Sequence, residues 1–341
     1  MQSDHGSVKP KIFVTYPIDF PEMDALYKSE KFDVVVSKKP RVLTHAELLE
    51  SVTGYDALVT QLSDIIDASV MDKAGDKLRL IANYAVGFDN VAVLDATKRK
   101  IAVTNTPDAS STAVAEHAMA LMLACAKNLS QADDFVRRGK YKGWDPQQMI
   151  GVELSGKKLG IIGCGKIGSL FALNCYHGLG MKILYHDVCK NYELERTAHA
   201  YQVSLNSLLR STDVVSLHVP LLPTTKHLMN ARTLALMKPS AILINTSRGP
   251  VVDEKALTLA LKGKKIMAAG LDVYENDPEL APGLKDLENT VLTPHSASAT
   301  LEARGRMAQM LVENVTEFFS GKVPPSLVNQ EIRHIIEEEK C

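Results

Sequence analysis

Residues 159–187 constrain the fold of this chain more than any other stretch. An apolar run of strand length at residues 159–162 leads directly into three glycines in G-x-G-x-x-G spacing, at Gly163, Gly165 and Gly168. The first glycine permits a tight turn, the second lets backbone approach a pyrophosphate, and the third lets the following helix pack close to the strand. The N–H groups and positive dipole end of that helix suit phosphate. The turn therefore predicts a dinucleotide site.

The residues after the glycines complete this interpretation. Residues 169–179 have a helical pattern, and a second apolar run at residues 181–185 is soon followed by Asp187. Asp187 lies 19 positions after Gly168, close to the ~20-residue offset of the carboxylate that binds a ribose 2′-hydroxyl. A carboxylate there repels a 2′-phosphate, so Asp187 favours NAD, although Lys190 leaves some use of NADP open. The alternative interpretation is a glycine-rich turn that binds nothing.

The composition is that of a globular enzyme. The chain has 341 residues, of which 45% are apolar and 23% charged, and its net charge is −1. This length favours two domains, and the charge balance gives no reason to expect nucleic acid as a partner. The N-terminus is polar, without the apolar core of a signal peptide, and the longest apolar tract, residues 118–126, is too short to span a membrane. Five cysteines without C-x-x-C pairing predict free thiols, no metal site and a cytoplasmic protein.

The first third of the chain alternates strand and helix patterns, which predicts a parallel sheet covered on both faces. Strand patterns occur at residues 11–16, 32–37, 57–60, 78–83 and 101–104. Helical patterns occur at residues 22–28, 44–52, 68–74 and 91–99, and the second of these begins with a capping box from Thr44 to Glu47. Residues 16–19 occupy the place where dinucleotide-binding glycines would stand. This domain is therefore expected to contact substrate and not the dinucleotide.

Two stretches between the blocks have different characters. Residues 112–128 form an apolar helix on nearly all sides, which predicts burial in a core or at a subunit interface. Residues 131–146 are polar and hold the single tryptophan, Trp144. This second stretch is either an ordered surface loop or a dimerisation arm, and composition does not choose between them.

The second block continues the sheet begun at residue 159. Further strand patterns at residues 214–219, 241–246, 266–271 and 291–293 bring the number of parallel strands to six, and helical patterns occur at residues 231–237, 253–262 and 299–321. The fold class is α/β, with two Rossmann-like, doubly wound parallel-sheet domains. We expect residues 1–108 and 299–341 to form a flavodoxin-like substrate domain, and residues 109–298 to form the NAD-binding domain.

Three motifs with reactive side chains follow successive strands of the second sheet, where ligands of such sheets lie. They contain Arg248, the pair Asp272 and Asp277, and His295. An arginine can hold a carboxylate with two hydrogen bonds, a histidine can exchange a proton near neutral pH, and a carboxylate can orient the imidazole. Together they suit hydride transfer to a 2-keto acid. Singly, each has another explanation: a surface ion pair, a helix cap or a turn residue.

Longer motifs extend over nearly the whole chain: NYAVGFDN, ELSGKKLGIIGCGKIG, LHVPLLPTTKHLMN, NTSRGPVVDEKAL, GLDVYENDPE and LTPHSASAT. In these the sequence resembles the D-isomer-specific 2-hydroxyacid dehydrogenases, and within them the glyoxylate/hydroxypyruvate reductases. The resemblance implies two domains with a cleft between them, a homodimer, and reduction of a small 2-keto acid with His295 as acid/base. D-lactate or phosphoglycerate dehydrogenase activity, or an NAD(H)-sensing corepressor-like binding protein, remain alternatives. The exact substrate and the physiological direction stay open.

The resemblance also assigns residues. Arg248 is the substrate-binding arginine, the backbone of Val86 and Gly87 holds the substrate carboxylate, and Asp277 partners His295. Most relatives have glutamate at the position of Asp277, and aspartate reaches ~1.3 Å less far, so the loop has to move in for the pair to form. Beyond the three glycines, the residues that match cofactor contacts are Lys166, Ile167, Asp187, Val219, Pro220, Thr225, Thr246 and Asp272.

Overall fold

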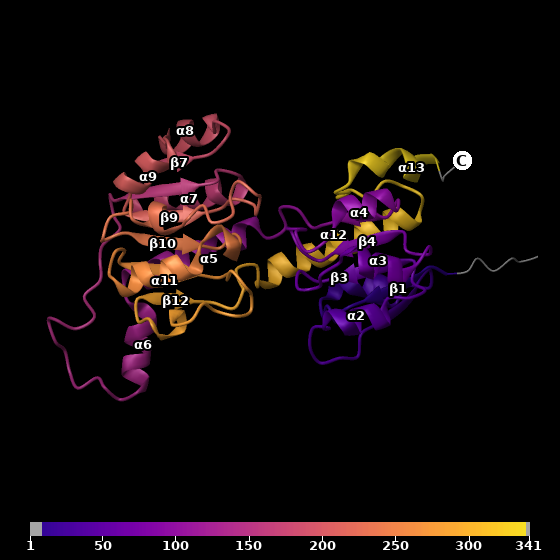
Figure 1. Ribbon diagram of the computed structural model, residues 1–341, viewed down its shortest axis with the longest axis horizontal. Coiled ribbons are helices and arrows are strands. Elements are labelled where there is room, and N and C mark those ends of the chain that lie inside the picture. The colour runs from indigo at the N-terminus through magenta and orange to yellow at the C-terminus, as the bar shows by residue number, and fades with distance from the viewer. Residues whose placement is uncertain (1–8, 339–341) are drawn as a thin grey trace, which may run out of the picture. The chain divides into compact units, whose positions relative to one another are not determined.

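The computed structural model describes residues 9–338 and divides the chain into two compact units (Figure 1). Unit 1 comprises Met1–Ser110 and Thr300–Cys341, and unit 2 comprises Ser111–Ala299. The predictions that concern the polar segment before Lys9 and the thiol of Cys341 lie outside the described residues. Within residues 9–338, no helix is both long and apolar enough to cross a membrane.

Unit 1 is built on a five-stranded parallel sheet in the order β2-β1-β3-β4-β5, which is the flavodoxin-like order. Its strands are β1 (Lys11–Val14), β2 (Asp33–Val36), β3 (Ala57–Thr60), β4 (Leu80–Asn83) and β5 (Ala102–Thr104). Its helices are α1 (Asp24–Tyr27), α2 (His45–Ser51), α3 (Ala68–Ala74), α4 (Val93–Lys98), α12 (Leu301–Phe319) and α13 (Arg333–Glu338), with short 3-10 turns at Pro21–Met23 and Gln330–Ile332. The capping box predicted for α2 is confirmed.

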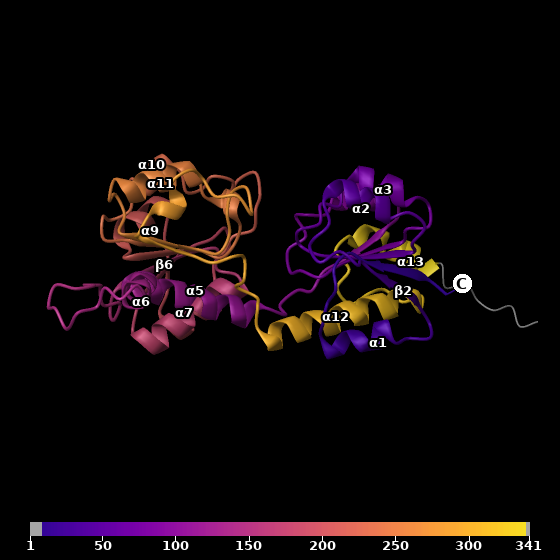
Figure 2. The same cartoon turned by 90° about the horizontal axis from the view of Figure 1, so that it is seen from below.

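Helices cover both faces of this sheet because its strands are apolar on both sides. Along β1, Ile12 and Val14 join the core beneath α1 and α12, whereas Phe13 joins the core beneath α2, α3 and α4. Figure 2 shows α2 and α3 on one face and α1 and α12 on the other. Helix α12, from the last part of the chain, thus packs on a sheet whose strands come from the first part.

Unit 2 is built on a seven-stranded parallel sheet in the order β12-β11-β10-β9-β6-β7-β8. Its strands are β6 (Lys158–Ile162), β7 (Lys182–His186), β8 (Tyr201–Gln202), β9 (Val214–Leu217), β10 (Ile242–Asn245), β11 (Ala268–Leu271) and β12 (Thr290–Leu292). Its helices are α5 (Ser111–Ala126), α6 (Leu129–Arg137), α7 (Lys166–Leu179), α8 (Tyr192–Ala198), α9 (Leu205–Ser211), α10 (Ala231–Leu234) and α11 (Glu254–Lys262), with 3-10 turns at Gly249–Val251 and Leu284–Asp286. The two parallel-sheet domains confirm the predicted fold class.

The predicted number of six strands in this sheet is wrong. The seventh strand, β8, has two residues, both exposed, and lies at the edge of the sheet beside β7. Helices α8 and α9 on either side of it were also not predicted. Helices α8 and α9 bury only two side chains each and the edge strand buries none, so these segments give no clear hydrophobic period.

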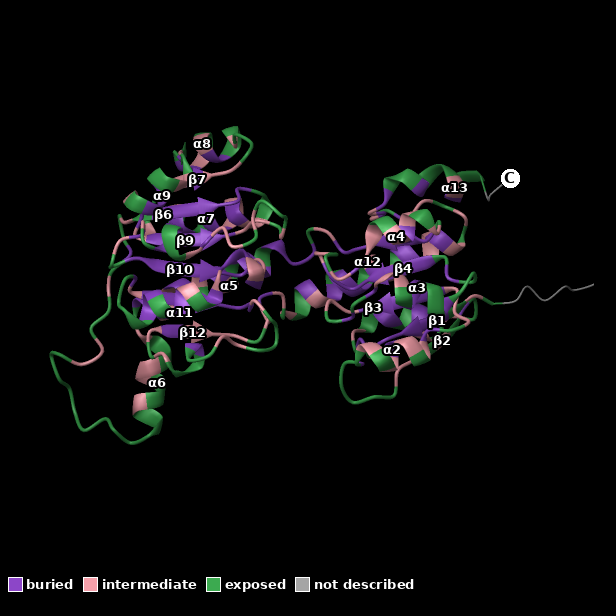
Figure 3. Cartoon of the chain, viewed as in Figure 1, coloured by how far each residue is buried: buried purple, intermediate pink, exposed green. Residues whose placement is uncertain are grey.

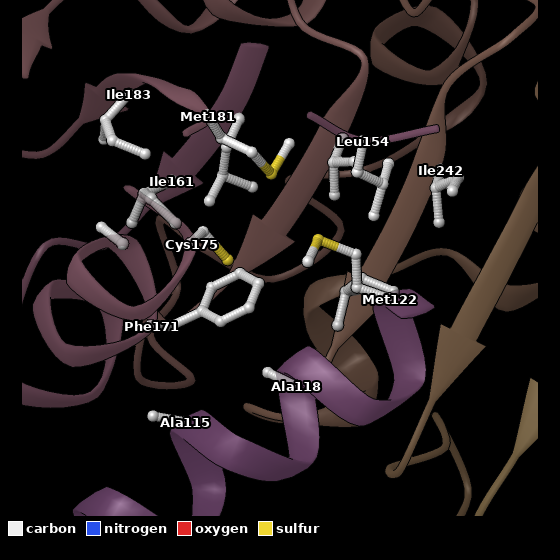
Figure 4. Close-up of a cluster of buried hydrophobic side chains, with 14 of the residues drawn as sticks. Ala115, Ala118, Met122, Leu154, Ile161, Phe171, Cys175, Met181, Ile183 and Ile242 are labelled. Atoms are coloured by element: carbon white, nitrogen blue, oxygen red, sulfur yellow. The ribbon is translucent and has the colours of Figure 1, made fainter. Parts of the chain in front are cut away.

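The apolar helix α5 packs in the core of unit 2. Burial in a core was one of the two alternatives predicted for this helix, the other being a subunit interface. Figure 4 shows Ala115, Ala118 and Met122 of α5 facing Phe171 and Cys175 of α7. Small residues permit this close packing against the sheet. At Gly270 of β11, for example, a Cβ atom would lie 2.9 Å from Cβ of Leu121. The opposite face of the sheet is covered by α9, α10 and α11 (Figure 2).

The polar stretch at residues 131–146 begins within helix α6, which the sequence interpretation as a surface loop or a dimerisation arm did not include. Ion pairs between Asp133 and Arg137 and between Asp134 and Arg138, at 2.7 Å each, stabilise α6 along its surface. No residue of α6 is buried (Figure 3). The segment that follows carries Trp144, whose surface is 83% exposed.

Candidate active site

The glycine turn after β6 adopts the conformation that its spacing predicts. Gly163 has a φ of +90°, and a Cβ atom there would lie 2.6 Å from the carbonyl oxygen of His218, so only glycine fits. A Cβ atom at Gly168 would clash with the carbonyl oxygen of Gly163. Gly165 faces open space and is the N-cap of α7, which has no side chain to cap its first turn. Open space at Gly165, at the start of α7, is what a pyrophosphate needs.

Asp187 lies directly against this turn. It follows β7, and its Oδ2 accepts a hydrogen bond of 2.5 Å from the backbone N–H of Cys164, between the first two glycines. Its Oδ1 accepts from the N–H of Cys189 at 3.1 Å. The carboxylate is therefore fixed beside the glycine turn. The Cys164 thiol is buried, which raises its pKa to about 12 and keeps it protonated at neutral pH.

Two further strand ends contribute predicted cofactor residues. After β9, Val219 packs beside the glycine turn, since its Cγ1 lies 2.8 Å from where a Cβ of Gly163 would be. The hydroxyl of Thr225 donates to the carbonyl of Pro220 at 2.6 Å and fixes the loop that follows. After β10, the buried hydroxyl of Thr246 has no hydrogen-bond partner among the described residues. An orphaned polar atom at this edge of the sheet fits the binding of a polar cofactor.

The structure brings His295 and Asp277 together. Nδ1 of His295 lies 2.8 Å from Oδ2 of Asp277, and both side chains are about one-third exposed, at 34% and 39%. The shorter aspartate therefore reaches the histidine. His295 has a φ of +53°, and its backbone N–H donates to the carbonyl of Asp272 at 2.9 Å. This turn leaves the imidazole accessible and excludes the alternative that His295 lies in or caps a helix, because the next helix begins after the N-cap Thr300.

Arg248 lies after β10 in extended backbone, and its Nη1 donates to the carbonyl of Ser247 at 2.8 Å. The next residue, Gly249, packs so tightly on Tyr274 that a Cβ atom would clash with the Tyr274 carbonyl oxygen. The backbone that follows Arg248 therefore packs directly against the backbone that precedes the loop carrying Asp277.

Asp272 anchors the histidine turn. It is buried, and its carboxylate accepts from the Thr293 hydroxyl at 2.6 Å and from the backbone N–H groups of Ser296 and Ala297 at 2.8 Å each. Nε2 of His117 lies 3.4 Å away. Burial alone would raise the pKa of Asp272, but these hydrogen bonds outweigh it and the pKa is lowered. A role of Asp272 toward the cofactor stays a prediction.

Sequence reasoning missed His117 as part of this site. A histidine within an apolar helix indicates a polar contact in the fold. Its partners, Thr293 and Asp272, lie more than 150 residues away in the sequence, so the sequence did not identify them.

The predicted substrate loop lies in unit 1 after β4. The carbonyl of Val86 accepts from the Asn105 side chain at 2.7 Å, and the carbonyl of Gly87 accepts from the Asn83 side chain at 3.0 Å. These asparagines fix the backbone of the loop, and neither was singled out from the sequence.

Two glycine substitutions separate folding from cofactor binding. Gly165→Ala is expected to weaken NADH binding at least tenfold with the Tm within about 2 °C, because its Cβ meets no protein atom but enters the path of the pyrophosphate. Gly168→Ala is expected to cost about 1–3 kcal/mol through overpacking against Gly163. Fluorescence titration with NADH and thermal unfolding measure the two effects. Equal losses of stability in both variants would contradict this assignment.

Comparison with known proteins places the chain in a family. Residues 119–297 match the model of the NAD-binding domain of D-isomer specific 2-hydroxyacid dehydrogenases. Glyoxylate reductase of Pyrococcus furiosus is 45% identical over 95% of this chain and 97% of its own length, and that of Aeropyrum pernix is 46% identical with the same coverage. A solved structure of D-lactate dehydrogenase from Aquifex aeolicus, in complex with NAD and lactic acid, has a TM-score of 0.80 at 29% identity and covers 93% of this chain and 98% of its own. The chain belongs to the D-isomer specific 2-hydroxyacid dehydrogenase family.

Proposed function

We propose that the protein is an NAD-dependent reductase of small 2-keto acids of the glyoxylate and hydroxypyruvate type. The contact that carries the proposal is the 2.8 Å pair of His295 and Asp277, at strand ends of the sheet that holds the glycine turn. Relatives 43–46% identical that bear the name glyoxylate reductase support the substrate class.

The residues divide the chemistry among them. Arg248 binds the substrate carboxylate with two hydrogen bonds. In the substrate domain, the backbone N–H groups of Val86 and Gly87 are the groups proposed to bind substrate. His295 donates a proton to the carbonyl oxygen as the keto acid becomes a hydroxy acid, and Asp277 orients the imidazole and favours its charged form. When bound, NADH supplies the hydride. In the oxidative direction, His295 takes up the proton.

The glycine turn, Lys166 and Ile167 would hold the pyrophosphate, and Asp187 would bind the ribose hydroxyls. Val219, Pro220, Thr225, Thr246 and Asp272 line the remaining cofactor path in this proposal. The carboxylate of Asp187 disfavours a 2′-phosphate, so NADH is used in preference to NADPH.

A steady-state assay of NADH absorbance tests the proposal. Glyoxylate and hydroxypyruvate are expected to turn over with the highest kcat/KM, ahead of pyruvate and phosphohydroxypyruvate. Highest activity with one of the last two would favour the D-lactate or phosphoglycerate alternative. Binding of NADH without turnover of any keto acid would favour a corepressor-like binding protein and overturn the enzymatic proposal, and preference for NADPH would overturn the assignment of Asp187.

The segment that begins with α6 supports a proposed homodimer. Residues 129–150, which we call the arm, expose Leu129, Val136, Tyr141, Trp144 and Ile150 by 52–83%. So many large exposed apolar side chains in one segment favour a protein partner, and a second copy of this chain is the one proposed.

The cysteines support a proposed cytoplasmic location. Three described cysteines with buried thiols, Cys125, Cys164 and Cys175, suit a reducing compartment such as the cytoplasm.

Light scattering after size exclusion tests the dimer. The wild type is expected at twice the chain mass of 37.3 kDa, and the double variant Val136→Asp, Trp144→Asp at the mass of one chain, because two charges would be buried in an apolar interface. Tyr192→Asp is the control, since Tyr192 is 73% exposed outside the arm. A monomeric wild type, or an unchanged mass of the double variant, would contradict the proposal.

A further inference from the structure

We propose that Glu254 is a positioning residue that holds Asp277 within reach of His295. The proposal rests on the function proposed above for that pair. Asp277 is one methylene shorter than the glutamate of most relatives, about 1.3 Å less in reach, yet its Oδ2 lies 2.8 Å from the imidazole. The loop of residues 275–281, which carries Asp277, therefore has to be held close to His295 by other contacts.

The carboxylate of Glu254 makes such contacts at both ends of this loop. Glu254 is the first residue of α11 and is only 4% exposed. Its Oε2 accepts from the backbone N–H of Glu275 at 2.8 Å, and its Oε1 accepts from the N–H of Ala281 at 2.6 Å. Because these hydrogen bonds are charge-assisted and shielded from water, they are stronger than ordinary ones. One side chain thus fastens the two ends of the loop.

Reciprocal contacts fix the base of the loop. Oε2 of Glu275 accepts from the backbone N–H of Glu254 at 3.2 Å, and its Oε1 lies 2.6 Å from Nε2 of His227. The backbone N–H of His227 donates to the carbonyl of Pro250 at 2.8 Å. The loop that carries Asp277 is therefore tied to the segment that follows Arg248, so Glu254 fixes the catalytic carboxylate relative to the rest of the site.

A purely structural role of Glu254 predicts a different result. An acidic residue in the first turn of a helix also stabilises the helix through its dipole. If that were all, replacing Glu254 would lower thermal stability without an effect that depends on the side chain at position 277. A positioning role requires that dependence.

The primary test is Glu254→Gln, which keeps the size of the side chain and one acceptor oxygen but places an NH2 group where an acceptor is needed. We expect kcat for keto-acid reduction to fall about tenfold, as for a loosened proton-transfer geometry, with the KM for NADH within twofold of the wild type. Glu193→Gln is the matched control, because Glu193 is an exposed acid in the first turn of α8. Its kinetics are expected to be unchanged.

Double variants make the test specific. In an Asp277→Asn background, Glu254→Gln is expected to cause no further loss beyond twofold, because the group it positions is already gone. Asp277→Glu is expected to restore most of the rate of Glu254→Gln, because the longer side chain reaches His295 from a looser loop. The proposal is overturned if Glu254→Gln leaves kcat unchanged, or if its effect is equally large when Asp277 is asparagine.

Hydrogen exchange measured by mass spectrometry gives a readout that does not need activity. Glu254→Gln is expected to speed exchange at least fivefold in a peptide that covers residues 274–281, with residues 159–168 unchanged. If the wild type reduces no keto acid, the proposed function fails and hydrogen exchange alone tests the role of Glu254. Faster exchange in the loop would then support the contact between Glu254 and the loop, and unchanged exchange would overturn it.

Discussion

Replacing His295 with asparagine is expected to lower kcat for glyoxylate reduction by about 10²–10⁴-fold, the usual contribution of a positioned general acid. Asparagine keeps polar atoms at the site but cannot deliver a proton to the carbonyl oxygen. The affinity for NADH is expected to stay within threefold, because the turn around His295 is fixed by the carboxylate and backbone of Asp272 and not by the imidazole.

Steady-state kinetics and a fluorescence titration with NADH measure the two quantities. His177→Asn serves as the control, since His177 is an exposed histidine in the last turn of α7. Retention of kcat within threefold in His295→Asn would mean that another group donates the proton. A large loss of NADH affinity would assign His295 to binding and not to proton transfer.

Replacing Arg248 with alanine is expected to lower kcat/KM for glyoxylate by about 10²–10³-fold, mainly through KM. Two charge-assisted hydrogen bonds to the substrate carboxylate are worth about 3–4 kcal/mol together. Arg248→Lys keeps the charge but loses the planar fork, so it is expected to recover only part of the loss.

The stability of the variant has to be checked, because Arg248 precedes the tightly packed Gly249. We expect the Tm of Arg248→Ala to remain within about 3 °C, since only the side chain changes, which at this domain size is about 1 kcal/mol. Arg196→Ala, at an exposed arginine in the last turn of α8, is the control for loss of positive charge. An unchanged KM in Arg248→Ala would show that the substrate carboxylate is held elsewhere.

Much of the fold could be predicted because its signals are local. Strands β3 and β10 are short runs of mostly apolar side chains. The caps Thr44 and Asp253 accept hydrogen bonds from residues three positions later. The glycine turn was equally readable from its spacing, and a Cβ atom at Gly163 or Gly168 would clash with a backbone carbonyl, whereas Gly165 faces open space. Helix α6 was missed because its segment is largely polar and none of its residues is buried.

The geometry of the candidate site was less predictable because it depends on contacts between remote segments. The sequence left open whether Asp277 reaches His295, and the answer depends on where the loop lies. Glu254 binds that loop from 21 and 27 positions away in the sequence. His117 of helix α5 contacts Asp272, which follows strand β11. No local sequence pattern indicates such pairs. The site residues could therefore be recognised by type, whereas the residues that hold them in place could not.

The configuration of the product tests the central claim most directly. Hydroxypyruvate becomes chiral on reduction, whereas glyoxylate does not, so hydroxypyruvate with NADH is the reaction to follow. Chiral chromatography of the glycerate formed is expected to give the D-isomer, at a rate that falls about 10²–10⁴-fold in His295→Asn. Formation of the L-isomer, or of no glycerate at all, would contradict the account.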